Sequence, residues 1–183
     1  MTENIIAGVL CEEREDMTQD EDFRKKIIEE YKQSVLPLLK YLPWFEQHRG
    51  QETATVFRGQ GIQDNSLSFP VYDAMLMRFL KEAGSTTLMD RNYRYVYTKK
   101  HLDSHDAERD LIRNASWREW DLLKGIFSRY VMGGRTKPAL WSEGVKENIF
   151  VLVLTKMNEI IEFWDMPLDK QMMFAAADMH GLR

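Results

Sequence analysis

Apolar residues recur every three or four positions along much of this chain, a spacing that is typical of amphipathic helices. The pattern is clearest after the acidic residues 20–22, where one helical face carries Phe23, Ile27, Ile28, Tyr31, Val35, Leu38, Leu39 and Leu42. Proline lacks an amide donor and clashes with the preceding turn. We therefore expect Pro37 to kink or split this helix and Pro43 to end it.

The first 19 residues carry a shorter apolar pattern, followed by a charged run. A helix would place four apolar residues on one face: Ile5, Ile6, Val9 and Leu10. Two interpretations stay open, namely a first helix docked on the protein's own core and an arm that packs on a neighbouring subunit. We accordingly divide the chain into residues 1–19, an N-terminal helical arm or first helix, and residues 20–183, a single α-helical domain.

The helical pattern is interrupted in the middle of the chain by glycines and β-prone residues. The runs 53–58 and 66–69 predict a small β-hairpin, although a loop fits them equally well. Pro70 suits the first position of the next helix, and Gly84 should stop that helix. The alternating tyrosines of residues 92–98 fit either a strand or a helix packed on one side.

Two further helices are predicted in the C-terminal half. Ser116 and Glu119 form a capping-box pattern, which opens a helix over 117–132. The glycine pair 133–134 should end it, because glycine readily adopts the left-handed conformation that follows many helices. The next helix, 138–163, begins with a proline, which is favoured at that position. We expect these two helices to form an antiparallel αα-hairpin.

These patterns together predict an all-α fold, which is a single, mainly helical domain with one small β-hairpin at most. A chain of 183 residues suits one domain. A domain of that size buries roughly 70% of the surface that its unfolded chain exposes, so it needs no disulfide or metal to hold its core.

Charge and cysteine content exclude several classes of protein. The formal net charge is −4 and the cations are spread along the chain, which argues against a nucleic-acid partner. Cys11 is the sole cysteine, so no internal disulfide can form, and a reducing cytoplasm is the expected location. No stretch approaches the roughly 20 apolar residues of a membrane helix, and we expect no membrane partner.

The stretch MGGRTKPALW, residues 132–141, is the main candidate for a binding site. It lacks the spacing of a Walker A loop. A helix N-terminus nevertheless offers free amides and partial positive charge. Arg135 and Lys137 beside it would favour a carboxylate or phosphate, and Trp141 would add a flat apolar wall. The alternatives are solvated cations with a core tryptophan, or a subunit contact.

His101 and His105 are spaced so that both would face one side of a helix, as transition-metal ligands often do. The zinc-protease pattern, however, has a glutamate after its first histidine, where this chain has Leu102. Asp103 also resembles a helix N-cap, which would leave His101 outside the helix. We therefore predict a solvated surface at these two histidines, without a bound metal. For the chain as a whole we predict no other cofactor and no catalytic residues.

Two segments of this chain resemble a family of uncharacterised bacterial proteins. The proteins of that family share a proline–aromatic helix start, a helix that ends in tyrosine-valine, a turn with arginine and a final apolar helix. The matching positions are Phe69, Pro70, Tyr72, Phe79, Tyr130, Val131, Arg135, Trp141, Gly144 and Ile149. The resemblance covers roughly residues 66–163, and the turn is longer and more basic here than in the family's pattern. It implies an α-rich bacterial domain without an established activity.

Two functional hypotheses follow from these observations. The first is a non-enzymatic bacterial interaction or regulatory protein that self-associates, as a homodimer or larger homo-oligomer. It rests on the apolar terminal segments and on the lack of a catalytic pattern. The alternative is a protein, including the case of an enzyme, that binds a small anionic molecule at the 133–141 turn.

Overall fold

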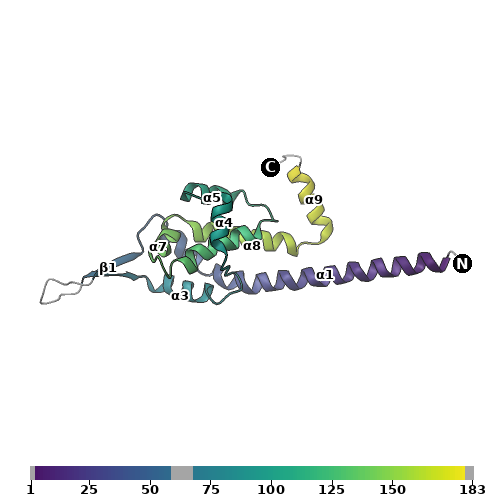
Figure 1. Cartoon of the computed structure of the whole chain (residues 1–183), viewed down its shortest axis with the longest axis horizontal. Helices are drawn as coiled ribbons and strands as arrows, with labels where there is room; N and C mark the ends of the chain where they lie inside the picture. Colours follow the sequence, from purple (N-terminus) through teal and green to yellow (C-terminus); the bar gives the residue numbers. More distant parts are fainter. Residues whose placement is uncertain (1–2, 59–67, 180–183) are drawn as a thin grey trace.

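A long N-terminal helix dominates the shape of the protein in the computed structural model, which describes the backbone of residues 3–58 and 68–179 and the side chains of 21–56 and 70–173. This helix, α1, spans Glu3–Leu39. Its C-terminal half packs on the body of the molecule, chiefly on α8, whereas its N-terminal half extends away from the body (Figure 1).

The prolines near the end of α1 neither split that helix nor end a helix. Pro37 lies inside α1 and does not split it, because Val35 and Leu38 on either side are fully buried and hold the last turn against the core. Pro43 does not end a helix either. It lies in the first turn of α2 (Leu42–Gln47), where a missing amide donor costs no hydrogen bond.

The predicted hairpin is present, with different ends. β1 (Ala54–Arg58) pairs with β2 (Ser68–Tyr72) in an antiparallel two-stranded sheet, and the hairpin projects at the end of the molecule opposite to the N-terminus (Figure 1). Pro70 pairs with Val56 inside β2 and does not start a helix. A two-stranded sheet consists of edge strands, where a residue without an amide donor is tolerated.

Helices make up most of the described chain, which confirms the predicted all-α class. After the hairpin they are α3 (Ala74–Ala83), α4 (Tyr93–Lys100), α5 (His105–Arg113), α6 (Trp120–Ser128), the π-helical turn η1 (Arg129–Gly133), α7 (Ala139–Lys146), α8 (Ile149–Asp165) and α9 (Leu168–Met179). The tyrosine-rich residues 92–98 thus belong mainly to a helix. None of the described helices has the length and apolar character needed to cross a membrane.

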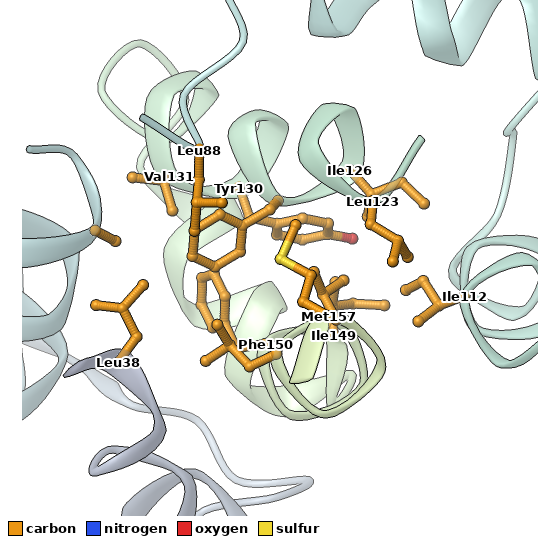
Figure 2. Close-up of a cluster of buried hydrophobic side chains, with 14 of the residues drawn as sticks. Leu38, Leu88, Ile112, Leu123, Ile126, Tyr130, Val131, Ile149, Phe150 and Met157 are labelled. Carbon is orange, nitrogen blue, oxygen red and sulfur yellow. The ribbon is translucent and has the colours of Figure 1, made fainter. Parts of the chain in front are cut away.

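The hydrophobic core surrounds α8, which contacts α1, α5, α6 and α7 (Figure 2). Its buried residues are Ile149, Phe150, Val153, Leu154, Met157, Ile160 and Ile161. Phe150 is the centre of an aromatic cluster, with edge-to-face contacts to Phe79, Phe127 and Tyr130. Such pairs add about 0.5–1.5 kcal/mol each beyond the area they bury.

The helix predicted over 138–163 is in fact two helices, so the simple αα-hairpin prediction was wrong. The chain breaks at Asn148, whose φ of 62° is left-handed, between α7 and α8. The break folds Phe150 back onto Gly144, where any Cβ would overlap the ring. As a result α7 packs on η1, and α8 packs on α6.

The glycine pair ends a helix, but for a different reason from the one predicted. Gly134 has a right-handed backbone, with φ of −61°. The space beside it is filled by the indole of Trp141, which a Cβ on Gly134 would overlap. The indole Nε1 donates to the carbonyl oxygen of Val131 at 3.2 Å. Close approach, and not left-handed geometry, therefore requires glycine here.

Candidate functional site

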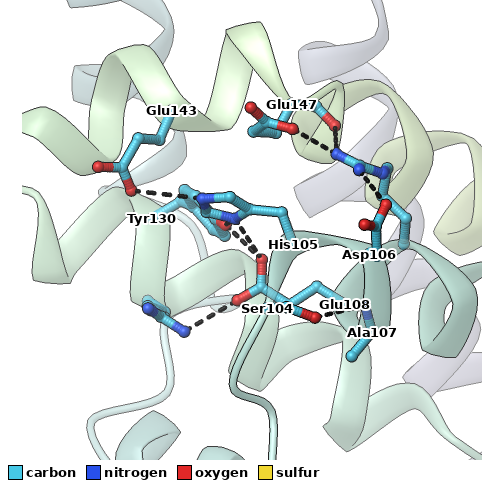
Figure 3. A network of polar contacts seen from close by, with 10 residues as sticks. Ser104, His105, Asp106, Ala107, Glu108, Tyr130, Glu143 and Glu147 are labelled. Carbon is cyan, nitrogen blue, oxygen red and sulfur yellow. Dashed lines mark hydrogen bonds and ion pairs between the residues drawn. The ribbon is translucent and has the colours of Figure 1, made fainter.

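A buried network of polar side chains joins α5, η1 and α7 (Figure 3). Its centre is Glu108, which is 1% exposed. One carboxylate oxygen accepts from Arg129 Nη1 at 2.8 Å. The other accepts from the Tyr130 hydroxyl and lies 3.2 Å from His105 Nδ1. A buried carboxylate is costly unless it is paired, and here three side chains from two elements supply the partners.

The π-helical turn η1 supplies two of these partners from consecutive positions. Arg129 and Tyr130 are its first two residues, and both reach Glu108 on α5. A π turn is wider than an α turn and is often found at functional sites. The change of helix type at residue 129 thus coincides with the part of the chain that meets the buried charge.

Hydrogen-bond directions in the network follow from the state of Tyr130. Burial, and next the charge of Glu108, raise the pKa of Tyr130 above its ordinary value. The phenol therefore keeps its proton and donates a hydrogen bond to Glu108. His105 Nδ1 lies 3.0 Å from the phenol oxygen, which is left as an acceptor, so Nδ1 carries the donated hydrogen. Its Nε2 lies 3.9 Å from Glu143 on α7.

Both carboxylate oxygens of Glu108 already accept hydrogen bonds from neighbouring side chains. Arg129 is held on its other side as well, because its guanidinium lies 4.1 Å from the centre of the Tyr97 ring on α4. A carboxylate bound in this way is poorly placed to take a proton from a substrate. The geometry therefore supports a role in joining α4, α5 and η1.

A cavity of about 500 Å³ lies next to this network, between α4, η1 and the turn that leads into α7. Three cations line it, namely Arg94, Arg129 and Lys137. Tyr93 and Tyr97 supply aromatic walls. None of the described residues that line the cavity is a carboxylate, so the lining is positively charged.

The structure places the three residues predicted at the turn in three different surroundings. Lys137 lines the cavity. Arg135 is exposed and points elsewhere, with its guanidinium close to Gly84 at the end of α3. Trp141 is half-buried, and its ring meets Tyr72 edge-on at 5.3 Å. The turn therefore brings one of its three candidates to the cavity.

The two histidines belong to different elements. His101 follows α4 with a left-handed φ of 51°, whereas His105 is the first residue of α5 and contacts Glu108. They do not share one helical face. Among the described residues, no group of three or more histidine, cysteine, aspartate or glutamate side chains is arranged to hold a metal ion.

The sequence did not predict a site formed by Glu108, Arg129 and Tyr130, although Tyr130 is one of the positions that carry the family resemblance. It did not predict a binding role for Arg94 either. Glu108 and its partners on η1 are more than 20 positions apart, and Arg94 lies further still from Lys137. The one local signal is the spacing of His105 and Glu108, which are three residues apart and can therefore meet on one helical face.

Comparisons of this chain with protein-family models, curated proteins and solved structures found no match. The resemblance to uncharacterised bacterial proteins over residues 66–163 therefore stays a prediction.

Proposed function

We propose that this chain is a self-associating interaction protein in which α1 of one copy packs on a second copy. The observation that carries this proposal is that the first half of α1 extends beyond the body as a single helix (Figure 1). Residues 3–20 form about 27 Å of helix at 1.5 Å per residue. Helices in proteins gain most of their stability by packing an apolar face. A partner surface would supply that packing.

The spacing of apolar positions links this arm to the body. Positions 5, 9 and 10 lie 18 residues before Phe23, Ile27 and Ile28, and 18 residues complete five helical turns. The backbone of α1 therefore brings both sets of positions to the same side of the helix. On the body this side is incompletely covered, because Phe23 is 65% exposed.

An aromatic groove adjoins Phe23 and offers a place for a second helix. It has a volume of about 490 Å³, and its lining includes Ile27, Tyr31, Trp117 and Trp164. Exposed apolar surface of this kind marks interaction sites. It also contains two cations, Arg24 and Arg118, against one carboxylate.

A second copy of the chain fits both features. In an antiparallel pair of α1 helices that cross near Met17, positions 5–10 of each copy lie opposite positions 24–29 of the other. Each arm then covers the other copy's groove, and the assembly closes as a two-fold dimer. Residues 11–16 of the arm lie opposite residues 18–23 of the other copy, so it is the apolar positions 5–10 that meet the groove. The bacterial cytoplasm, favoured by the single cysteine and the family resemblance, is the proposed setting.

Sedimentation velocity over about 1–100 µM tests the proposal. We expect the full chain to be a dimer, and deletion of residues 1–18 or Phe23→Glu to shift it to monomer. Val56→Glu is the matched control, because Val56 on the hairpin is 63% exposed and lies away from the groove. A full chain that stays monomeric at tens of micromolar contradicts the proposal, as does a Phe23→Glu variant that dimerises like the control.

A further inference from the structure

The cavity beside the polar network is lined by three cations, and only one of them is paired with a described carboxylate. Arg129 is paired with Glu108 through Nη1. Arg94 and Lys137 are both exposed, and neither appears in an ion pair among the described side chains. Cations gathered in a concave site attract anions, because the low-dielectric walls concentrate their field. We propose that this cavity binds the phosphate group of a small aromatic molecule.

The size and walls of the cavity favour an organic phosphate over a bare ion. Small-molecule sites usually have volumes of about 300–1,000 Å³, and this cavity has about 500 Å³. Tyr93 and Tyr97 offer ring surfaces, and Leu102 and Leu140 add apolar surface. A flat, apolar body can pack against these residues while its phosphate lies among the cations. Phosphate is suited to this lining because arginine and lysine form strong charge-assisted hydrogen bonds with its oxygens.

One of the three cations, Arg129, is held in place before any ligand arrives, and the backbone that carries a second, Lys137, is fixed. Glu108 and the ring of Tyr97 fix Arg129 from two sides. The turn that carries Lys137 is closed by a hydrogen bond of 2.9 Å from the Lys137 amide to the carbonyl oxygen of Gly133. Groups that are already ordered lose less conformational entropy on binding. The polar network thus prepares the cavity, although it contains no free base of its own.

Calorimetric titration of the full chain with phenyl phosphate tests this proposal, with inorganic phosphate and phenol as comparison probes. We expect saturable binding of phenyl phosphate that is tighter than that of either probe. Arg94→Ala and Lys137→Ala should each weaken it about tenfold or more, since each removes a charged hydrogen bond. Lys99→Ala is the matched control, because Lys99 lies on α4 outside the lining of this cavity.

Each other outcome has a definite meaning. If phenyl phosphate shows no saturable binding at concentrations up to tens of millimolar, the proposal is overturned. Equal losses in Lys99→Ala and Lys137→Ala overturn it too, since the effect is then one of net charge. Phenol binding as tightly as phenyl phosphate refutes a phosphate site. Circular dichroism of each variant shows whether it is folded, and the exposed positions of Arg94 and Lys137 make unfolding an unexpected result.

Discussion

Replacing Glu108 with alanine removes the carboxylate that three side chains contact at the junction of α5 and η1. Arg129 loses its carboxylate partner, and the Tyr130 hydroxyl loses its acceptor in a site where Tyr130 is fully buried. His105 Nδ1 loses one of its two neighbours. We expect this single change to weaken the fold more than any substitution on the exposed face of α5.

The magnitude follows from the burial of each partner. Breaking a buried ion pair by removing one member costs about 3–5 kcal/mol. The Arg129 side chain is 28% exposed, so water compensates part of its charge and the lower end of that range applies. A buried hydroxyl without a partner adds about 1–3 kcal/mol. We expect a loss of roughly 4–6 kcal/mol in total, a large part of the 5–15 kcal/mol that stabilises a typical domain.

Urea unfolding followed by circular dichroism measures this loss for Glu108→Ala and Glu108→Gln. Glutamine keeps the volume and one acceptor, so its cost should be clearly smaller. A double-mutant cycle with Arg129→Met should give a coupling free energy above about 1 kcal/mol. A loss below about 1 kcal/mol for Glu108→Ala, with an unchanged dependence on urea, would refute the central role of this carboxylate.

Three further predictions concern other parts of the molecule. Gly134→Ala should cost about 1–3 kcal/mol, because its methyl group overlaps the Trp141 indole, and thermal melts should show Trp141→Phe recovering part of this loss. Because the pKa of Tyr130 is raised in the folded state, the unfolded chain binds fewer protons than the folded one above about pH 10. The free energy of unfolding should therefore fall by up to about 1.4 kcal/mol per pH unit. Urea midpoints measured at pH 9–11 should show this fall in the wild type and a smaller one in the control Tyr130→Phe. In the proposed antiparallel dimer the two copies cross near residue 17, so a double variant with Met17→Cys and Cys11→Ser should form a disulfide between copies. The wild-type chain, whose Cys11 lies away from the crossing point, should not. Non-reducing gels that show the reverse exclude this arrangement.

The helical class could be predicted from the sequence because it depends on local periodicity. Segments such as 22–39 and 149–163 repeat their apolar positions over several turns, and their helices follow. Helix ends were harder to predict, because they depend on contacts from elsewhere. The left-handed break at Asn148 accompanies the packing of Phe150 on Gly144, which no local pattern at residue 148 reveals.

The candidate site shows the same division between local and distant information. Arg135, Lys137 and Trp141 are neighbours in the sequence, which made a shared site plausible. Their side chains nevertheless take three directions, since each is positioned by a different part of the fold. Arg94, which lines the cavity with Lys137, is more than 40 positions away in the chain. Only the packing of α4 beside η1 brings the two together.

The continuity of α1 also has a mechanical consequence. The helix is 37 residues long, or about 55 Å, and no flexible joint separates the arm from the packed half. Bending the arm would mean breaking main-chain hydrogen bonds, so it should behave as a stiff lever. The packing of Val35 and Leu38 on the core then helps to set the direction of the whole helix. A small rotation of the helix at these contacts would displace its N-terminal end by a much larger distance.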